Sequence, residues 1–415
     1  MKRLKHHPSS EIVGTYSSTL KDTSIVVGVT SSAAAYRAVD VVRELMRRGA
    51  NVYVVMSKDA TKLVSPMLFE WATGNDVYVE FGGETGHIAL SKICSSMVIA
   101  PATLNTLAKV ASGVADTSVV LIAITMMGMG KPVVVAPAMH KCLWDSPQTK
   151  EVLSKIKHWG VTVVPPSIKE NKAKFPPVDD IVAAAEAATL RGKDLQGLKI
   201  LVTAGPTREY LDPVRFLTNA SSGRMGIAIA REAYFRGAEV TLVHGPVTVS
   251  VPHYIKSVGV RTTKEMLDAV ISEVTSRNYD AVILAAAPVD YTFSEYSKEK
   301  IKSSSSELRL TLVPTPKIST ELRKAFDGLL VGFAAETAFG SSSRLIELAR
   351  EKLKKRGFNI IVANDVSRSD IGFSSDFNEV YIIDDRGLAE HIPKSPKSVI
   401  ARRLLDLIRD RVAGQ

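Results

Sequence analysis

The segment Lys199–Gly237, KILVTAGPTREYLDPVRFLTNASSGRMGIAIAREAYFRG, runs from an apolar strand through a long loop rich in glycine, proline and serine into a helix. The loop opens with Thr203–Thr207, residues that favour tight turns and leave amide donors unpaired. Ser221–Gly223 then begins a helix, whose first N–H groups favour an anion. Such connections usually take about 2 to 6 residues, so this longer one predicts a phosphate-binding loop.

The second half of the chain continues the alternation of strand and helix. Between Glu295 and Pro316 a polar, serine-rich stretch precedes alternating leucines, which predicts a flap on a short hairpin. Alternating strands and helices predict a sheet with helices on both faces. Further apolar runs predict strands at Glu239–Val243, Ala281–Ala286, Leu330–Ala334, Asn359–Val362 and Glu379–Ile383.

The first half opens in the same way. A strand at Ile25–Val29 is followed by a break at Thr30–Ser32 and an amphipathic helix at Ala33–Arg47. The helical Ile181–Leu190 closes this half, and Arg191–Asp194 reads as a linker. We predict two doubly wound α/β domains, residues 1–192 and 193–415. Further strands are predicted at Val52–Met56, Met97–Ala100 and Val133–Ala136.

Length and composition describe a globular protein of two or three domains. The first 22 residues lack the apolar core of a signal peptide, and Ser118–Gly130 is shorter than the ~20 residues that span a bilayer. Cys94 and Cys142 are the two cysteines, which argues against a disulfide framework and a cysteine zinc site. These features predict a cytoplasmic protein without a membrane partner.

The formal net charge of +10 admits nucleic acid, anionic lipid or phosphorylated small molecules as partners. Lysine and arginine are scattered along helices, aromatic residues make up 6% of the chain, and no nucleic-acid-binding motif is present. We therefore expect phosphate-bearing small molecules and no nucleic acid. The alternative, that most of these charges solvate helix faces such as Glu347–Arg356, applies to the majority in any case.

Ligands of parallel sheets bind at the carboxyl ends of the strands. The predicted strands of this chain end in polar residues at these positions. In the second half such positions are the opening loop, Ala287–Tyr291, Glu336 and Asn364–Asp365. In the first half they are Ser31, Ser32, Ser57, Pro101–Asn105 and Pro137–His140.

Several of these segments resemble known families. The segments Pro101–Lys109, Ala111–Asp116 and Pro137–Trp144 are similar to signatures of flavin-dependent cysteine decarboxylases. Segments of the second half resemble phosphopantothenate–cysteine ligase: Val202–Arg208, Asp212–Arg215, Asn219–Gly226, Lys300–Lys302 and Ala363–Val366. In this order the two halves resemble the bifunctional coenzyme A biosynthesis enzymes over nearly the whole chain. The resemblance implies a flavodoxin-like FMN domain followed by a Rossmann-like ligase domain with a flap.

This resemblance also implies the reactions. The second half would activate 4′-phosphopantothenate with CTP and Mg²⁺ to an acyl-cytidylate, which the amine of cysteine attacks. The first half would use FMN to decarboxylate the product to 4′-phosphopantetheine. Homo-oligomers are implied as well, with trimeric flavin domains and dimeric ligase domains. Whether CTP or ATP is preferred stays open, as do the metal ligands.

In the ligase half the resemblance implies catalytic roles for Asn219 and Lys300. Asn219 can hydrogen-bond the reacting carboxylate without repelling it, and Lys300 with Lys302 can close over phosphate charge. The alternative for the two lysines is a solvated loop, and for Asp290 a simple turn residue. The implied substrate and nucleotide contacts are His140 in the first half and Gly205, Arg215, Ser221, Ser222, Gly223, Asp290, Lys302, Phe333, Ala334 and Asn364 in the second.

In the flavin half the resemblance implies that His87 handles the substrate carboxylate and protons, a role that suits imidazole near neutral pH. The alternative is a structural loop histidine. Asn105 can hold a carboxylate by its amide, or can cap a helix instead. The implied FMN contacts are Ser31, Ser32, Ser57, Thr103 and Ser112.

Three positions depart from the family pattern. His140 stands where the family usually has asparagine, Ser303 stands where it has a further lysine, and Val161–Val178 lacks the family's proton-donating cysteine. Cys142 is the nearest thiol in sequence and is either a replacement donor or an inert buried cysteine. The alternative function is therefore an active ligase whose flavin domain binds FMN with altered or lost decarboxylase activity.

Two rival functions make different predictions. A nicotinamide oxidoreductase requires a G-x-G-x-x-G fingerprint after a strand, and neither Val29–Ala33 nor Thr203–Thr207 supplies one. A flavin-binding regulatory protein without turnover predicts the loss of the ligase flap or of Asn219, and both are present.

Overall fold

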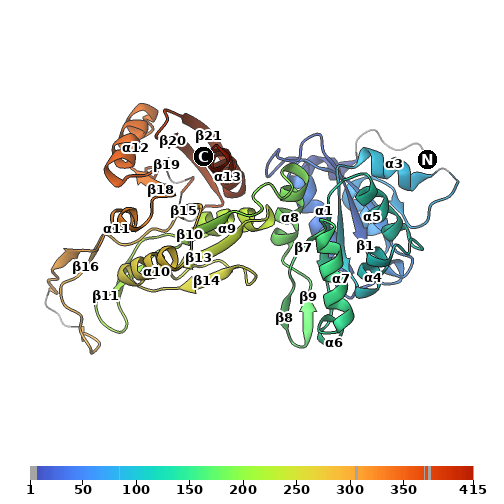
Figure 1. Cartoon of the computed structure of the whole chain (residues 1–415), viewed down its shortest axis with the longest axis horizontal. Helices are drawn as coiled ribbons and strands as arrows, with labels where there is room; N and C mark the ends of the chain where they lie inside the picture. Colours follow the sequence, from blue (N-terminus) through green and yellow to red (C-terminus); the bar gives the residue numbers. More distant parts are fainter. Residues whose placement is uncertain (1–6, 84, 304–306, 369, 373–374, 415) are drawn as a thin grey trace. The chain divides into compact units, whose positions relative to one another are not determined.

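The structure is a computed structural model that describes residues 7–83, 85–303, 307–368, 370–372 and 375–414. The chain forms two compact units, Met1–Lys193 and Asp194–Gln415, coloured from blue to green and from green to red in Figure 1. The division falls inside the segment Arg191–Asp194 that the sequence indicates as a linker. No helix within the described ranges is long and apolar enough to cross a membrane.

The first unit is built on a six-stranded parallel sheet in the order β3-β2-β1-β4-β5-β7. Without the two-residue edge strand β3 this is the flavodoxin order, which confirms the predicted fold class. The strands are β1 Ser24–Val29, β2 Asn51–Met56, β3 Val77–Tyr78, β4 Ser96–Ala102, β5 Val133–Pro137 and β7 Thr162–Val163.

Helices cover both faces of this sheet because buried side chains alternate along each strand. Val26, Met97 and Ile99 pack on the face that carries α3, α4, α5 and α7, whereas α1 and α8 contact the opposite face. The helices are α1 Ala38–Arg47, α2 Pro66–Thr73, α3 Gly86–Ile93, α4 Leu104–Ser112, α5 Ser118–Gly128, α6 Lys141–Trp144, α7 Pro147–His158 and α8 Val178–Leu190. The helix predicted at Ala33–Arg47 begins later, because a 3₁₀ turn occupies Ala35–Arg37.

The second unit has an eight-stranded sheet in the order β14-β13-β10-β15-β18-β19-β20-β21. Its first six strands run parallel, in the Rossmann order. The last two run antiparallel, because the chain returns from β19 to β20 through a loop instead of a crossover helix. The strands are β10 Lys199–Ala204, β13 Glu239–His244, β14 Lys256–Gly259, β15 Ala281–Leu284, β18 Leu329–Glu336, β19 Ile360–Asp365, β20 Phe377–Asp384 and β21 Ala389–Pro396.

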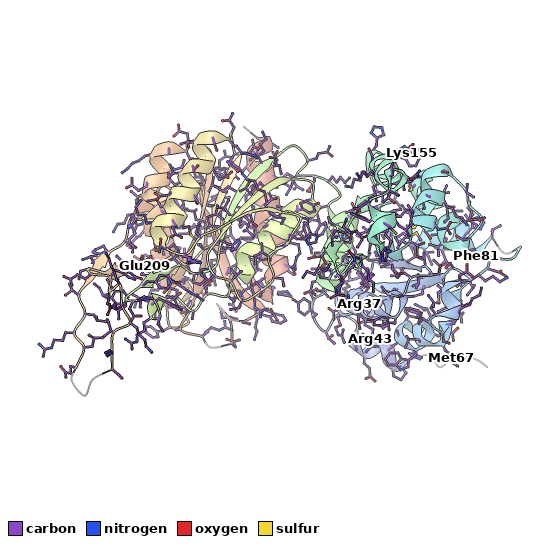
Figure 2. The ribbon with its side chains drawn as sticks, turned by 90° about the horizontal axis from the view of Figure 1, so that it is seen from below. Arg37, Arg43, Met67, Phe81, Lys155 and Glu209 are labelled. Carbon is purple, nitrogen blue, oxygen red and sulfur yellow. The ribbon has the colours of Figure 1, made fainter. Side chains whose placement is uncertain are left out.

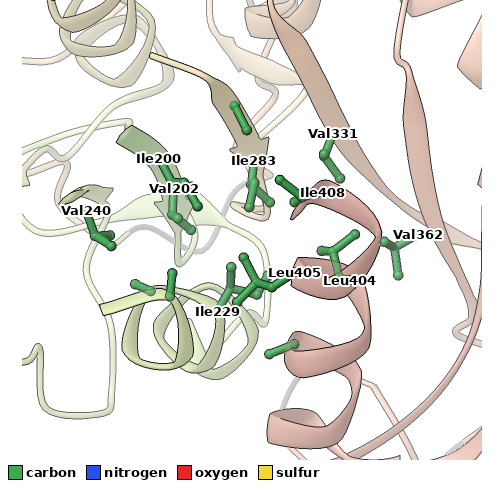
Figure 3. Packing of buried hydrophobic residues seen from close by; sticks show 14 of the residues in the cluster. Ile200, Val202, Ile229, Val240, Ile283, Val331, Val362, Leu404, Leu405 and Ile408 are labelled. Atoms are coloured by element: carbon green, nitrogen blue, oxygen red, sulfur yellow. The ribbon is translucent and has the colours of Figure 1, made fainter. Parts of the chain in front are cut away.

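The core of this unit follows from strict alternation in β10. Ile200 and Val202 point to the face covered by α9 and α13, where they meet Ile229, Leu404 and other residues drawn in Figure 3. Leu201 points to the other face, against α10, α11 and α12. The helices are α9 Arg224–Phe235, α10 Thr263–Ser276, α11 Ile318–Ala325, α12 Ser342–Arg356 and α13 Lys397–Ala413.

A buried ion network ties the start of the second unit to its last helix. The guanidinium of Arg236 is fully buried and donates to both carboxylate oxygens of Asp194, at 2.8 and 2.7 Å. It also lies 2.8 Å from the carboxylate of Asp406 in α13. Arg409, in the same helix, donates to Asp194 at 2.6 Å. Because Asp194 is held from two elements, the first residue of this unit is fixed to its last helix.

The predicted flap rests on a hairpin, as expected. Strand β16 (Tyr291–Phe293) pairs antiparallel with β17 (Leu312–Pro314), and a second small pair is formed by β11 (Arg208–Tyr210) with β12 (Phe216–Thr218). The carboxylate of Asp212 joins the two pairs, because it accepts hydrogen bonds from the N–H groups of Arg215 and Ile301. Residues 304–306 of the flap lie outside the described residues.

Candidate functional site

A cavity of about 510 Å³ opens at the carboxyl ends of the parallel strands of the second unit. It lies beside β10 and β15, where the strand order reverses, the usual ligand position in such sheets. The lining residues come from the segments after β10, β15 and β19, from the strands β18, β19 and β20, and from the helices α9 to α13. The volume falls in the range of small-molecule sites.

The loop between β10 and α9 forms one wall. Gly223 has φ +82°, and a Cβ atom there would come within 2.4 Å of Val247, so only glycine fits. As the N-cap of α9 it supplies no side chain to bind the first N–H groups of the helix. These groups are therefore available to an anion at this wall.

Asn219 connects this loop to the segment that follows β15. Its amide nitrogen donates to the carbonyl oxygens of Ala287 at 3.1 Å and Pro288 at 3.0 Å. The side chain is thus fixed at the cavity wall by its amide nitrogen. Glu209, labelled in Figure 2, fixes the neighbouring strand β11, because its buried carboxylate accepts the Thr263 N–H at the start of α10 at 2.8 Å.

The described lining of the cavity is strongly positive. It carries five cationic side chains and one carboxylate, that of Asp290. Asp290 is paired with Lys317, Lys352 donates to Glu336 at 3.0 Å, and Arg224 donates to Asp376 at 2.7 Å. The cations are Arg224, Lys317, Lys352, Arg356 and Lys397. Such a lining suits a ligand with several negative charges.

Asp365 holds the loops at the far end of the cavity. Its buried carboxylate accepts hydrogen bonds from the N–H groups of Ala338, Gly340 and Ser367 and from the Ser367 hydroxyl, at 2.7 to 3.2 Å. Burial alone would raise the pKa of this carboxyl, but the four hydrogen bonds outweigh it and hold the pKa well below its usual 3.8. The carboxylate therefore organises both loops around itself.

The structure brings together seven of the site residues predicted in the second half. Ala334 points into the core, because its neighbours on β18 face the cavity instead. Arg215 pairs with Asp212, and Gly205 stands behind the loop, where its carbonyl accepts from Ala287. Lys300 and Lys302 are exposed on the flap and do not line the cavity. The seven are Asn219, Ser221, Ser222, Gly223, Asp290, Phe333 and Asn364.

The sequence did not indicate that five cations line the cavity: Arg224, Lys317, Lys352, Arg356 and Lys397. Two of them carried a signal: Arg224 and Lys397 are the first residues of α9 and α13. A cation at a helix N-terminus is unfavourable to the helix dipole, which indicates another purpose. Lysine and arginine on α12 gave no such signal, since six of the fifteen residues of that helix are basic.

In the first unit the adjacent ends of β1 and β4 are joined by Thr30. Its hydroxyl donates to the Pro101 carbonyl at 2.7 Å and accepts from the Thr103 N–H at 3.2 Å. The predicted flavin contacts Ser31, Ser32, Ser57 and Thr103 all lie at this carboxyl edge, with Asn105 exposed in the first turn of α4. Ser112 ends α4, about 12 Å along the helix from Leu104, so the structure does not bring it to the same edge.

His87 lies in the first turn of α3, half-buried. Its Nδ1 atom is buried and has no hydrogen-bond partner within the described part of the chain. The ring of Phe81, labelled in Figure 2, lies 5.9 Å from the His87 ring and tilts across it. Buried polar atoms are usually satisfied, so an unpaired buried nitrogen at this position fits a ligand-binding histidine.

Cys142 lies against a small hairpin that the sequence did not predict. β6 (Met139–His140) pairs with β9 (Lys172–Lys174), which pairs with β8 (Ser167–Lys169). The Cys142 thiol is exposed, 3.2 Å from Nδ1 of His140. The interpretation of Cys142 as an inert buried cysteine is therefore wrong, and that description fits Cys94, whose pKa burial raises to about 12.

Comparison with known proteins identifies both units. The flavoprotein family matches residues 13–190, and the family "DNA/pantothenate metabolism flavoprotein C-terminal domain" matches residues 195–412. The coenzyme A biosynthesis bifunctional protein CoaBC of Thermococcus kodakarensis is 41% identical over 408 residues, 97% of this chain and 98% of that protein. The chain belongs to the CoaBC family. CoaBC of Escherichia coli K12 is 35% identical over 404 residues, covering 93% of this chain and 97% of its own.

A crystal structure of the C-terminal domain of a CoaBC protein is 38% identical to this chain. The match covers 54% of this chain and all of that domain, with a TM-score of 0.45. Membership of the CoaBC family confirms the predicted resemblance. The chain is a bifunctional enzyme of coenzyme A biosynthesis, with decarboxylase and ligase activities, and its first unit is a flavoprotein domain.

Proposed function

We propose that the second unit joins 4′-phosphopantothenate to cysteine with CTP, through an acyl-cytidylate, and that the first unit decarboxylates the product with FMN. The observation that supports the ligase step best is the cavity wall, where the uncapped start of α9, five cations and the fixed amide of Asn219 converge. A carboxylate needs a nucleotidyl leaving group before an amine can displace it. Such a reaction requires charge stabilisation of this kind.

The residues of the cavity divide the work. The N–H groups at the start of α9, with Ser221 and Ser222, bind the triphosphate together with Arg224 and Lys397. The amide of Asn219 orients the reacting carboxylate, and Phe333 with Asn364 contacts the nucleotide. Lys300 and Lys302, which do not line the cavity, act when the flap moves toward bound nucleotide.

Magnesium fits this cavity only as an ion bound mainly by the phosphates of the nucleotide. No cluster of three or more candidate ligands is present among the described residues, and Asp290 is the one carboxylate of the described lining. Mg²⁺ in nucleotide sites is commonly held by the phosphates and one or two carboxylates. We infer that Asp290 serves in this way after Lys317 exchanges its partner for phosphate.

The first unit suits FMN at the carboxyl edge of its sheet. Ser31, Ser32, Ser57 and Thr103 offer hydroxyl groups around the joined ends of β1 and β4. When bound, FMN supplies the two-electron oxidation of the cysteinyl thiol and the later return of these electrons. His87 then binds the substrate carboxylate through its Nδ1 atom together with the amide of Asn105, and His140 contacts the carboxylate or the pantothenoyl part. The family resemblance predicts trimers through this unit, dimers through the ligase unit and a cytoplasmic location.

The test is a complete reaction with purified protein, 4′-phosphopantothenate, cysteine, Mg²⁺ and either CTP or ATP. We expect a yellow protein that releases pyrophosphate with CTP and forms 4′-phosphopantetheine. A yellow protein that accumulates only the cysteine adduct would support the alternative, an active ligase with a deficient decarboxylase. A colourless protein that releases no pyrophosphate would refute both activities.

Replacing Cys142 tests which group donates the proton to the decarboxylated product. If the Cys142 thiol protonates the decarboxylated product, Cys142→Ser lowers 4′-phosphopantetheine formation by roughly 10²-fold or more, because a serine hydroxyl is a far weaker acid. Pyrophosphate release by the ligase unit stays unchanged. The matched control is Cys94→Ser, which removes the buried thiol. Full turnover of the Cys142 variant would show that the proton comes from another group.

A further inference from the structure

The first turn of α13 places a buried lysine in the wall of the ligase cavity. Lys397 is 6% exposed and lines the cavity. Its ammonium group donates to the carbonyl oxygens of Gly372 at 2.8 Å and Ser375 at 2.5 Å. Gly372 itself lines the cavity. The lysine therefore holds Gly372 and Ser375 beside the site.

The charged groups around Lys397 come from two further elements. Arg224, the first residue of α9, donates to the carboxylate of Asp376 at 2.7 Å, and the Lys397 N–H donates to the Asp376 carbonyl at 3.0 Å. Asn378 of β20 adds a neutral side chain to the same wall. Two cations thus face one carboxylate at the end of the cavity formed by the start of α9.

Burial, and to a lesser extent the charge of Arg224, lower the pKa of Lys397 to about 8, with Asp376 offsetting part of the effect. A lysine with this pKa is partly neutral in mildly alkaline solution. An incoming polyanion stabilises its charged form, so binding raises its pKa. Phosphate groups are themselves fully ionised above about pH 8 and release no proton there.

We propose that Lys397 is a proton-linked positioning residue: it takes up a proton when a nucleoside triphosphate enters the cavity, and the charged ammonium then holds Gly372 and Ser375 as the wall of the occupied site. This inference rests on the proposed nucleotide site. Charge-assisted hydrogen bonds are roughly twice as strong as neutral ones. Proton uptake therefore tightens the wall at the moment of binding.

Calorimetric titration with CTP and Mg²⁺, without the other substrates, measures this directly. In two buffers of different ionisation enthalpy at pH 8.5, we expect an uptake of about half a proton per site if binding raises the pKa by about one unit. The affinity for CTP then falls roughly fivefold from pH 7 to pH 9. The sign follows because the charged form, which binds better, is lost as the pH rises through about 8.

Two variants separate this role from a structural one. Lys397→Arg stays charged, so its CTP affinity is constant from pH 7 to pH 9 and no proton is taken up. Lys397→Met is always neutral, so at pH 7 it binds CTP roughly tenfold more weakly than the wild type, the full effect of a shift of one pKa unit. Lys193→Arg is the matched control, because burial also lowers the pKa of Lys193, in the first unit; it leaves the uptake unchanged.

Binding of CTP without proton uptake in the wild type would overturn the inference and leave the proposed function standing. Undiminished uptake in Lys397→Arg would overturn it as well, because another group would then carry the proton. Absence of CTP binding at every pH would overturn the nucleotide site and this inference together.

Discussion

Asn219→Asp is expected to lower amide formation between 4′-phosphopantothenate and cysteine by about 10²- to 10³-fold, the usual scale of losing one group that stabilises charge at a reacting centre. Aspartate cannot donate to the carbonyl oxygens of Ala287 and Pro288, which now fix the Asn219 amide at 3.1 and 3.0 Å. Its negative charge also repels the carboxylate that must approach. Pyrophosphate release and adduct formation, measured separately, report the loss.

The matched control is Asn278→Asp, which places the same change on an exposed position outside the cavity. This variant keeps wild-type ligation. Decarboxylation of supplied phosphopantothenoylcysteine is a second control, because the flavoprotein unit is separate, and it stays unchanged in both variants. Ligation by Asn219→Asp above about one tenth of the wild-type rate would contradict the role of Asn219.

Asp365→Ala is expected to weaken CTP binding strongly and to lower the thermal midpoint of the second unit by several degrees. Three N–H groups and one hydroxyl lose their shared acceptor, and buried donors without acceptors are costly. Residues that flank both loops, such as Ala335 and Val366, line the cavity, so the binding site loosens together with the fold. Thermal unfolding and CTP titration measure the two effects.

The pH dependence provides an independent test. The folded pKa of Asp365 lies below its usual 3.8, so its stabilising contribution is complete above about pH 4 and is lost as the pH falls toward the folded pKa. The wild-type unit therefore loses stability in acid, and Asp365→Asn shows a flatter profile below pH 4. Asp268→Asn is the control, because it makes the same change at an exposed position of α10 outside the cavity. Equal acid sensitivity of wild type and Asp365→Asn would contradict the assignment.

The sequence predicts the strands of both units well, because a strand buried on two faces is a continuous apolar run such as Ile200–Val202. It predicts the phosphate loop for a similar reason, since Gly223 is required by backbone geometry. It does not reveal the cationic wall, because Lys352 and Arg356 lie on a helix whose other lysines and arginines are solvated. Nor does it show that Asp365 serves as a loop anchor, because that role depends on N–H groups that are 25 to 27 residues away in sequence.

The buried ion pairs of Arg236 bear on how the ligase unit can be joined to another domain or separated from it. The carboxylate of Asp194, the first residue of the ligase unit, accepts hydrogen bonds from Arg236 and from Arg409 of the last helix. A gene fusion or fission placed just before Asp194 would leave the ion pairs between the start of the ligase unit and its last helix intact. Evolution can then join this unit to a flavoprotein, or release it as an independent gene product, without redesigning its interior.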